Sequence, residues 1–109
     1  MKDTEEIIQA LIKFRNERDW EQFHNAKDLA IAINVEAGEL LELFLWKNPD
    51  DADIKKVEEE LADIFAFSFL LADKFGFDIK DIVLKKINKN SVKYPVSKAK
   101  GTAKKYNEL

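Results

Sequence analysis

Four carboxylates in two pairs are the residues of this sequence best suited to catalysis. Glu36 and Glu39 stand three positions apart in the segment INVEAGELLELFLW, and Glu60 and Asp63 repeat that spacing in ELADIFAFSFLL. Residues three apart on a helix project to the same side, with about 5–6 Å between their Cβ atoms. If the two helices face each other, the pairs gather four carboxylates within one small volume.

The surroundings of both pairs are apolar, which makes these acids unusual. On a helix, Glu36 falls in the middle of an otherwise apolar face, and Asp63 shares its face with Phe67 and Leu70. A carboxylate buried without a partner is strongly unfavourable because its charge loses hydration. An isolated Glu-x-x-Glu pair is ordinarily a solvated surface feature, but two pairs set into apolar faces favour a functional cluster.

Divalent cations would stabilise such a cluster. Without them the carboxylates repel one another and some must hold protons. Ligands that are all oxygen suit hard ions, Mg²⁺ first and Mn²⁺ as a possible substitute. A helix-bundle di-iron site needs Glu-x-x-His on two helices, and the single histidine, His24, lies outside the acidic helices. Because Mg²⁺ keeps open positions for water and phosphate oxygens, the pattern favours attack of water on a phosphoryl group.

Hydrophobic periodicity predicts four helices that position these acids. The 109 residues, 46% of them hydrophobic, with three Gly and two Pro, indicate one mostly helical domain. Short connections favour an all-α, four-helix bundle-like fold. The predicted helices span residues 4–18, 26–46, 52–75 and 79–91.

Polar residues mark the predicted helix ends. Gly76 is a plausible left-handed residue after the third helix. The expected N-terminal caps are Asp3 or Thr4 for the first helix, Asp50 or Asp51 for the third and Asp78 for the fourth.

The domain is expected to span residues 1–95. The polar segment 96–109 shows no periodic pattern, so we expect a flexible or surface-draped tail. The second predicted helix is apolar nearly all round, which indicates a central helix or one covered by a second subunit.

Composition argues against several classes of function. The net charge is −3, so no basic surplus points to a nucleic-acid polymer as partner. The longest apolar run, residues 64–72, is too short to span a membrane. The chain has no cysteine, which fits a reducing cytoplasm, and the charged residues from Lys2 onward predict no signal peptide.

The acidic motif and its surroundings resemble a known family. Glu36-x-x-Glu39 followed after about twenty residues by Glu60-x-x-Asp63 resembles the metal motif of the all-α nucleoside triphosphate pyrophosphohydrolases, the MazG-like superfamily. The segments RDWEQFH, GELLELFLW, EELAD, KYP and KKYNEL are similar to its dCTP pyrophosphatase-like branch.

The resemblance implies Mg²⁺-dependent cleavage of a nucleoside triphosphate between its α and β phosphates. The products are a monophosphate and pyrophosphate, and the role is nucleotide-pool cleaning. The resemblance makes Glu36, Glu39, Glu60 and Asp63 the metal ligands and catalytic residues. It also implies a homodimer or homotetramer whose active sites use more than one chain.

The resemblance further indicates which residues contact substrate. Trp20 and Trp46 match positions that contact the base, and Asn90 matches a polar position in the pocket. From the residues alone, both tryptophans are more typical of a core than of a base-stacking platform, and the irregular segment 18–28 either lines a pocket or plugs a bundle end. The full set of substrate-binding candidates is Trp20, His24, Trp46, Phe67, Lys86, Asn90, Lys93 and Tyr94.

The sequence departs from the family pattern around the base. Phe67 stands where the mammalian-like enzymes carry a tyrosine and Leu11 where they carry a histidine, while Ser91 and Val92 interrupt a basic run. Losing a polar recognition group broadens substrate choice, so the preferred base stays open. Two other hypotheses are a non-catalytic oligomeric module that binds nucleotides or regulates an enzyme, and a partner-binding bundle that uses the basic tail.

Overall fold

The computed structural model describes residues 2–109, without the side chain of Lys2. Every regular element in this range is a helix, which confirms the predicted all-α class. The elements, with η for a 3₁₀-helix, are α1 (Lys2–Glu17), η1 (Glu21–Phe23), α2 (Ala26–Glu42), η2 (Pro49–Asp51), α3 (Ile54–Lys74), α4 (Ile79–Lys93), α5 (Val96–Ala99) and η3 (Tyr106–Glu108).

The chain divides into two compact units. Residues 1–76 hold α1, α2 and α3, and residues 77–109 hold α4, α5 and η3. Within the described residues, no helix is both long and apolar enough to cross a membrane. The predicted division into a domain of residues 1–95 and a tail stays a prediction.

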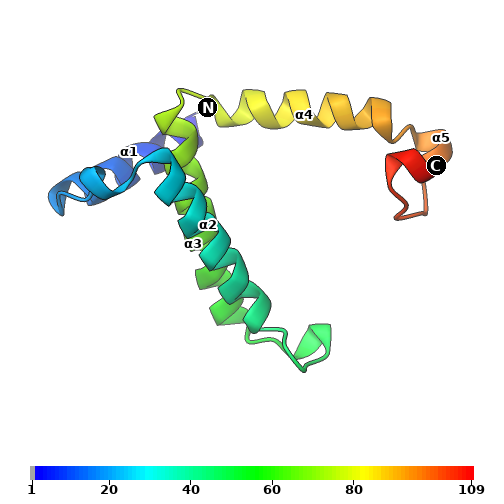
Figure 1. Cartoon of the computed structure of the whole chain (residues 1–109), viewed down its shortest axis with the longest axis horizontal. Coiled ribbons are helices and arrows are strands. Elements are labelled where there is room, and N and C mark those ends of the chain that lie inside the picture. Colours follow the sequence, from blue (N-terminus) through cyan, green and yellow to red (C-terminus); the bar gives the residue numbers. More distant parts are fainter. Residues whose placement is uncertain (1) are drawn as a thin grey trace. The chain divides into compact units, whose positions relative to one another are not determined.

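In the first unit α2 and α3 form an antiparallel pair, and α1 packs against α3 (Figure 1). Leu29 on α2 is 2% exposed and Leu70 on α3 is 6% exposed. Because these helices are amphipathic, packing their apolar faces also brings the acidic residues on those faces toward one another.

The helix α2 ends at Glu42, so the prediction that it continues to Trp46 is wrong. The backbone N–H groups of Leu43, Phe44 and Leu45 donate to carbonyls three residues earlier, which tightens the chain into turns. Trp46 then adopts a φ of 59°. The turns end the right-handed helix, and the left-handed residue after them prevents it from resuming, even though the apolar pattern continues.

Asp53, rather than Asp50 or Asp51, caps α3. Its Oδ1 accepts the N–H groups of Lys55 and Lys56 at 3.0 and 3.4 Å, whereas Asp50 and Asp51 lie inside η2. The earlier cap was predicted because the sequence does not reveal that Pro49 starts a separate 3₁₀ turn.

The other predicted helix ends have mixed outcomes. Asp78 caps α4, accepting the N–H of Asp81 at 2.9 Å, and Gly76 follows α3 with a φ of 70°, both as predicted. The helix α1 already begins at Lys2, so Asp3 and Thr4 lie within its first turn and the predicted cap is wrong.

The second unit contains two short helices within the segment expected to be a polar tail. The chain forms α5 directly after Pro95 and η3 near its end. The Tyr106 ring lies edge-on to Tyr94 at 6.2 Å, and the Lys93 Nζ lies 4.9 Å from the Tyr106 ring centre. These contacts were not foreseen because single helical turns leave no periodic pattern.

Candidate metal centre and nucleotide pocket

Three of the four predicted acids converge between α2 and α3. Carboxylate oxygens of Glu36, Glu60 and Asp63 all lie within 4.8 Å of one another. Glu39 is not in this group, but it follows Glu36 by one turn and affects the pKa of both Glu36 and Glu60. The antiparallel pairing of the two helices therefore gathers the acids as their spacing predicted.

The cluster contains buried acceptors that no group in the described chain satisfies. Glu36 and Glu60 are half-buried, and the Oε2 atom of each is inaccessible to solvent and lacks a hydrogen-bond partner. A buried acceptor left in this condition is unfavourable and is uncommon in folded proteins. A cation bound between the helices would satisfy both oxygens.

The protonation of the cluster also reflects its crowding. Burial, together with the neighbouring carboxylates of Glu39, Glu60 and Asp63, raises the pKa of Glu36 from 4.5 to about 7. Hydrogen bonding with Glu36 lowers the pKa of Glu60, but burial and the charges of Glu39 and Asp63 outweigh it, so the net change is upward. Glu36 therefore holds a proton at a pH where ordinary glutamates are ionised, and a cation could replace it.

The donor set of this cluster fits a hard divalent cation. All the converging atoms are carboxylate oxygens, and Mg²⁺ and Mn²⁺ prefer oxygen ligands. Asp63 is exposed while Glu36 and Glu60 are half-buried. A cation held here would therefore have protein ligands on one side and an open side toward solvent.

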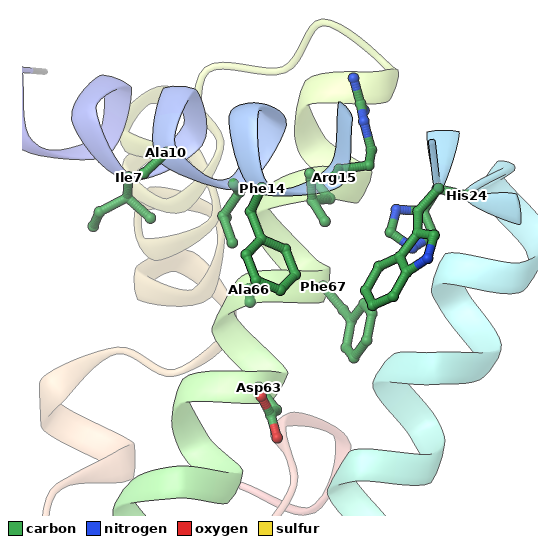
Figure 2. A pocket seen from close by; sticks show the side chains of 11 residues that line it. Ile7, Ala10, Phe14, Arg15, His24, Asp63, Ala66 and Phe67 are labelled. Atoms are coloured by element: carbon green, nitrogen blue, oxygen red, sulfur yellow. The ribbon is translucent and has the colours of Figure 1, made fainter. Parts of the chain in front are cut away.

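An apolar cavity of about 600 Å³ adjoins the acidic cluster and shares Asp63 with it. In Figure 2, Asp63 lies one turn from Phe67 along α3, and Arg15 from α1 stands at the opposite end of the group. The residues that line the cavity are Ile7, Ala10, Leu11, Phe14, Arg15, Trp20, His24, Asp63, Ala66, Phe67 and Leu70.

His24 supplies an uncharged polar atom to the cavity wall. Its ring lies edge-on to Phe67 at 6.3 Å, and its Nδ1 is buried without a hydrogen-bond partner among the described residues. Burial lowers the pKa of His24, and the positive charges of Arg15 and Lys74 lower it further. The imidazole is therefore neutral at pH 7 and can bond to a bound molecule.

Trp20 forms an aromatic wall on the same cavity. Its ring meets that of Phe14 at 5.7 Å with an interplanar angle of 73°, and its side chain is 42% exposed. Of the two hypotheses for segment 18–28, lining a pocket is therefore the one that the structure favours. An aromatic face beside a cavity is suited to stacking against a planar ring.

The combination of an acidic cluster and an aromatic cavity agrees with comparisons to known proteins. The model of the MazG-like family matches residues 31–109, which is most of the chain. The chain belongs to the MazG-like family.

Relatives of this MazG-like chain include named enzymes. It is 39% identical to dCTP pyrophosphatase 1 of Bos taurus and 35% identical to that of Homo sapiens. These alignments cover 96% of the chain but 67% and 66% of the relatives, so the chain spans about two thirds of their length. The relatives indicate a hydrolase of the nucleotide pyrophosphatase class, and the predicted family is confirmed.

A solved structure supports the same assignment at the level of the fold. The chain matches the crystal structure of a pyrophosphatase from Archaeoglobus fulgidus with a TM-score of 0.76 and 36% sequence identity. The match covers 84% of this chain and 91% of that one. The all-α MazG-like fold is therefore shared with this archaeal protein.

The structure brings only some of the predicted substrate contacts to the cavity. Trp20, His24 and Phe67 line it, whereas Trp46 is 99% exposed and is not part of the lining. The remaining candidates belong to the second unit, so their role in this MazG-like chain stays a prediction; they are Lys86, Asn90, Lys93 and Tyr94.

Sequence reasoning missed much of the cavity lining. Ile7, Leu11 and Phe14 repeat at helical spacing on α1, and of these three only Leu11 was placed near the base, by the resemblance. Arg15 follows Leu11 by four residues and so continues that spacing. A charged residue at a core-facing position is the signal that could have found it. The lining residues not predicted as site residues are Ile7, Ala10, Leu11, Phe14, Arg15, Ala66 and Leu70.

Proposed function

We propose that this MazG-like chain is a Mg²⁺-dependent nucleoside triphosphate pyrophosphohydrolase, with Mn²⁺ as a possible substitute. It cleaves a (d)NTP, such as dCTP or a modified dNTP, to the monophosphate and pyrophosphate, and so cleans the nucleotide pool of the cytoplasm. The observation that carries this proposal is the pair of unsatisfied buried oxygens, on Glu36 and Glu60, beside a cavity that shares Asp63.

The acidic residues divide the work of metal binding and hydrolysis. Glu36, Glu60 and Asp63 hold the cation, and Glu39 completes the set from the next turn of α2. A bound Mg²⁺ supplies positive charge to the phosphates and polarises water. One of the four carboxylates orients the attacking water and accepts its proton, which leaves the nucleoside monophosphate and pyrophosphate as products.

The cavity receives the base of the nucleotide. Its aromatic walls, Trp20 and Phe67, offer faces for stacking, and the buried Nδ1 of His24 offers one hydrogen bond. Asp63 lies at the other end of the cavity, where a cation that it helps to hold would supply positive charge to the phosphates. Leu11 and Phe67 offer no hydrogen bond to the base, which supports a broad or altered base preference.

A homodimer or homotetramer is part of this proposal. In the described chain only three hydrophobic side chains, Leu29, Leu70 and Ala72, are buried, while Val35 and Leu41 on α2 are 51% and 63% exposed. Exposed apolar surface on this scale is typical of a subunit interface.

The second unit supplies charges that suit a shared site. Residues 77–109 contain nine lysines and three acidic residues, so they complement an acidic partner surface. In the proposed oligomer the substrate-facing residues of α4 and its end, together with Trp46, complete the site; these are Lys86, Asn90, Lys93 and Tyr94.

The test is a panel of canonical and modified nucleoside triphosphates with Mg²⁺, with identification of every product. Monophosphate and pyrophosphate are the expected products, and Glu39→Gln and Asp63→Asn are expected to abolish turnover while circular dichroism shows unchanged helicity. Glu58→Gln is the matched control, because Glu58 is an exposed acid of α3 outside the cluster.

Three results would contradict the proposal. Turnover of none of the triphosphates, combined with nucleotide binding, would indicate the non-catalytic module. Orthophosphate as the first product would move the cleavage to another phosphate bond. Full activity in both Glu39→Gln and Asp63→Asn would reject the metal assignment.

A further inference from the structure

Arg15 lines the cavity although no sequence motif pointed to it. Its side chain is only 15% exposed, yet it carries a permanent charge. In Figure 2 it stands at the opposite end of the group from Asp63. A guanidinium is rarely withdrawn from water to this extent unless it is paired, so the partners of Arg15 indicate its role.

Two interactions of Arg15 bracket Trp20. The carbonyl oxygen of Arg15 accepts the backbone N–H of Trp20 at 3.0 Å. Its guanidinium Nη2 lies 3.7 Å from the Oε2 of Glu21, the residue directly after Trp20. The backbone of Arg15 therefore binds the backbone of Trp20, and its side chain contacts the side chain of Glu21.

The turn that Arg15 holds is conformationally demanding. Asp19 has a φ of 54°, a left-handed conformation that is unfavourable for residues with a side chain. The Gln22 side chain donates to the Asp19 carbonyl at 3.0 Å and to its Oδ2 at 3.2 Å. A turn of this kind keeps its shape only while the surrounding contacts hold it.

The same turn also sets the position of His24. The backbone N–H of His24 donates to the carbonyl of Glu21 at 3.0 Å, and the His24 ring meets Phe67 across the cavity wall. A displacement of Glu21 would therefore move the walls formed by Trp20 and by His24 together.

We propose that Arg15 is a positioning residue that fixes Trp20 and His24 as one wall of the base pocket through its contact with Glu21. This inference rests on the proposed function of the cavity as the base pocket. Arg15 stands at the opposite end of the cavity from Asp63. Losing its side chain therefore weakens binding of the base without altering the hydrolysis step at the acidic cluster. The effect extends to every base, because it acts through the shape of the wall, and it is largest for a base that bonds to His24.

Kinetics of three single variants test the proposal. Arg15→Met is expected to raise KM about fivefold for every triphosphate that is turned over while kcat stays within about twofold, because a partly exposed ion pair makes a modest contribution. Glu21→Gln is expected to raise KM less. Lys13→Met removes a charge from an exposed position on the same helix, and its KM is expected to equal that of the natural protein.

The double variant shows whether Arg15 acts through Glu21. Arg15→Met combined with Glu21→Gln is expected to have the KM of Arg15→Met alone, because both changes break one contact. An unchanged KM in Arg15→Met, an equal rise in Lys13→Met, or a lower kcat without a higher KM would overturn the proposal. A rise confined to one base would also overturn it, since that result indicates direct contact with the base.

A spectroscopic measurement tests the position of Trp20 without turnover. The chain has two tryptophans, so Trp46→Phe leaves Trp20 as the only one. Adding Arg15→Met to this background is expected to move the emission of Trp20 to longer wavelength and to increase its quenching by acrylamide. An unchanged spectrum overturns the proposal. If the natural protein hydrolyses no triphosphate, the proposed function fails, while the spectrum still decides the role of Arg15.

Discussion

Glu36 on α2 and Glu60 on α3 point buried oxygens toward the same small volume, and neither Oε2 has a hydrogen-bond partner among the described residues. The two residues come from helices of opposite direction, so the arrangement follows from the packing of α2 on α3 and not from a local motif. The close approach of like charges is unfavourable without a cation. The metal-free protein is therefore less stable than it would be without this cluster.

This relationship predicts how the stability of the metal-free protein depends on pH. The pKa of Glu36 is raised from 4.5 to about 7 in the folded chain. Between these values the folded state binds more protons at Glu36 than the unfolded state does, so the free energy of unfolding decreases as pH rises from 4.5 to 7 and levels off above 7. Thermal melts in EDTA at pH 5, 6, 7 and 8 measure this. The contribution of Glu36 is the melting temperature of the natural protein minus that of Glu36→Gln at the same pH. A contribution that rises with pH would contradict the prediction.

Replacing Glu36 distinguishes the effect of the cluster on stability from its role in cation binding. Glu36→Gln removes one of the mutually repelling charges, so at pH 8 without metal its melting temperature is expected to exceed that of the natural protein. The same change removes a cation ligand. The rise in melting temperature with added Mg²⁺ is expected to disappear and turnover to fall about a hundredfold or more. Glu58→Gln serves as control and should retain the Mg²⁺ effect. A normal Mg²⁺ response in Glu36→Gln would exclude Glu36 as a ligand.

The parts of the molecule that the sequence predicted are those governed by helical periodicity. The spacing of Glu36, Glu60 and Asp63 on apolar faces was enough to predict their convergence, because an amphipathic helix has one face to bury. The C-terminal end of α2 and the N-terminal cap of α3 were predicted less well. The apolar pattern continues past Glu42, and only the backbone, through the tight turns after Glu42 and the left-handed Trp46, shows that the helix has already stopped.

The cavity was harder to predict because its walls come from separate elements. Leu11 and Phe14 on α1 look like core residues in the sequence, and nothing in their spacing shows that they leave a space in front of α3. The resemblance identified Trp20 and His24, which lie in a segment without periodicity. Arg15 was missed because its importance depends on Glu21, a contact across a turn that no helical pattern describes.

Asp53 is expected to matter for stability and not for catalysis. Its Oδ1 satisfies the first backbone N–H groups of α3, so Asp53→Ala is expected to lower the free energy of unfolding by about 1 kcal/mol. Asp50→Ala, in η2, is expected to change it by less than about 0.5 kcal/mol. Urea denaturation measures both, and KM for the nucleotide should be unaltered in each. A larger loss of unfolding free energy in Asp50→Ala than in Asp53→Ala would indicate that Asp50 caps α3, as the sequence predicted.

His24 is expected to contribute to base selection at little cost to the fold. Its Nδ1 is buried without a partner in the described chain, so the free protein gains no hydrogen bond from it. His24→Leu keeps the apolar contact with Phe67 and removes the polar atom. Its melting temperature is therefore expected to stay the same or to rise, because a buried unsatisfied group is lost. The ratio of kcat/KM between the best and the poorest base is expected to fall about tenfold, since the pocket loses its buried polar contact.

Phe23→Leu, at an exposed position of the same turn outside the cavity lining, is the control and should preserve that ratio. A lower melting temperature with unchanged selectivity in His24→Leu would make His24 a structural residue.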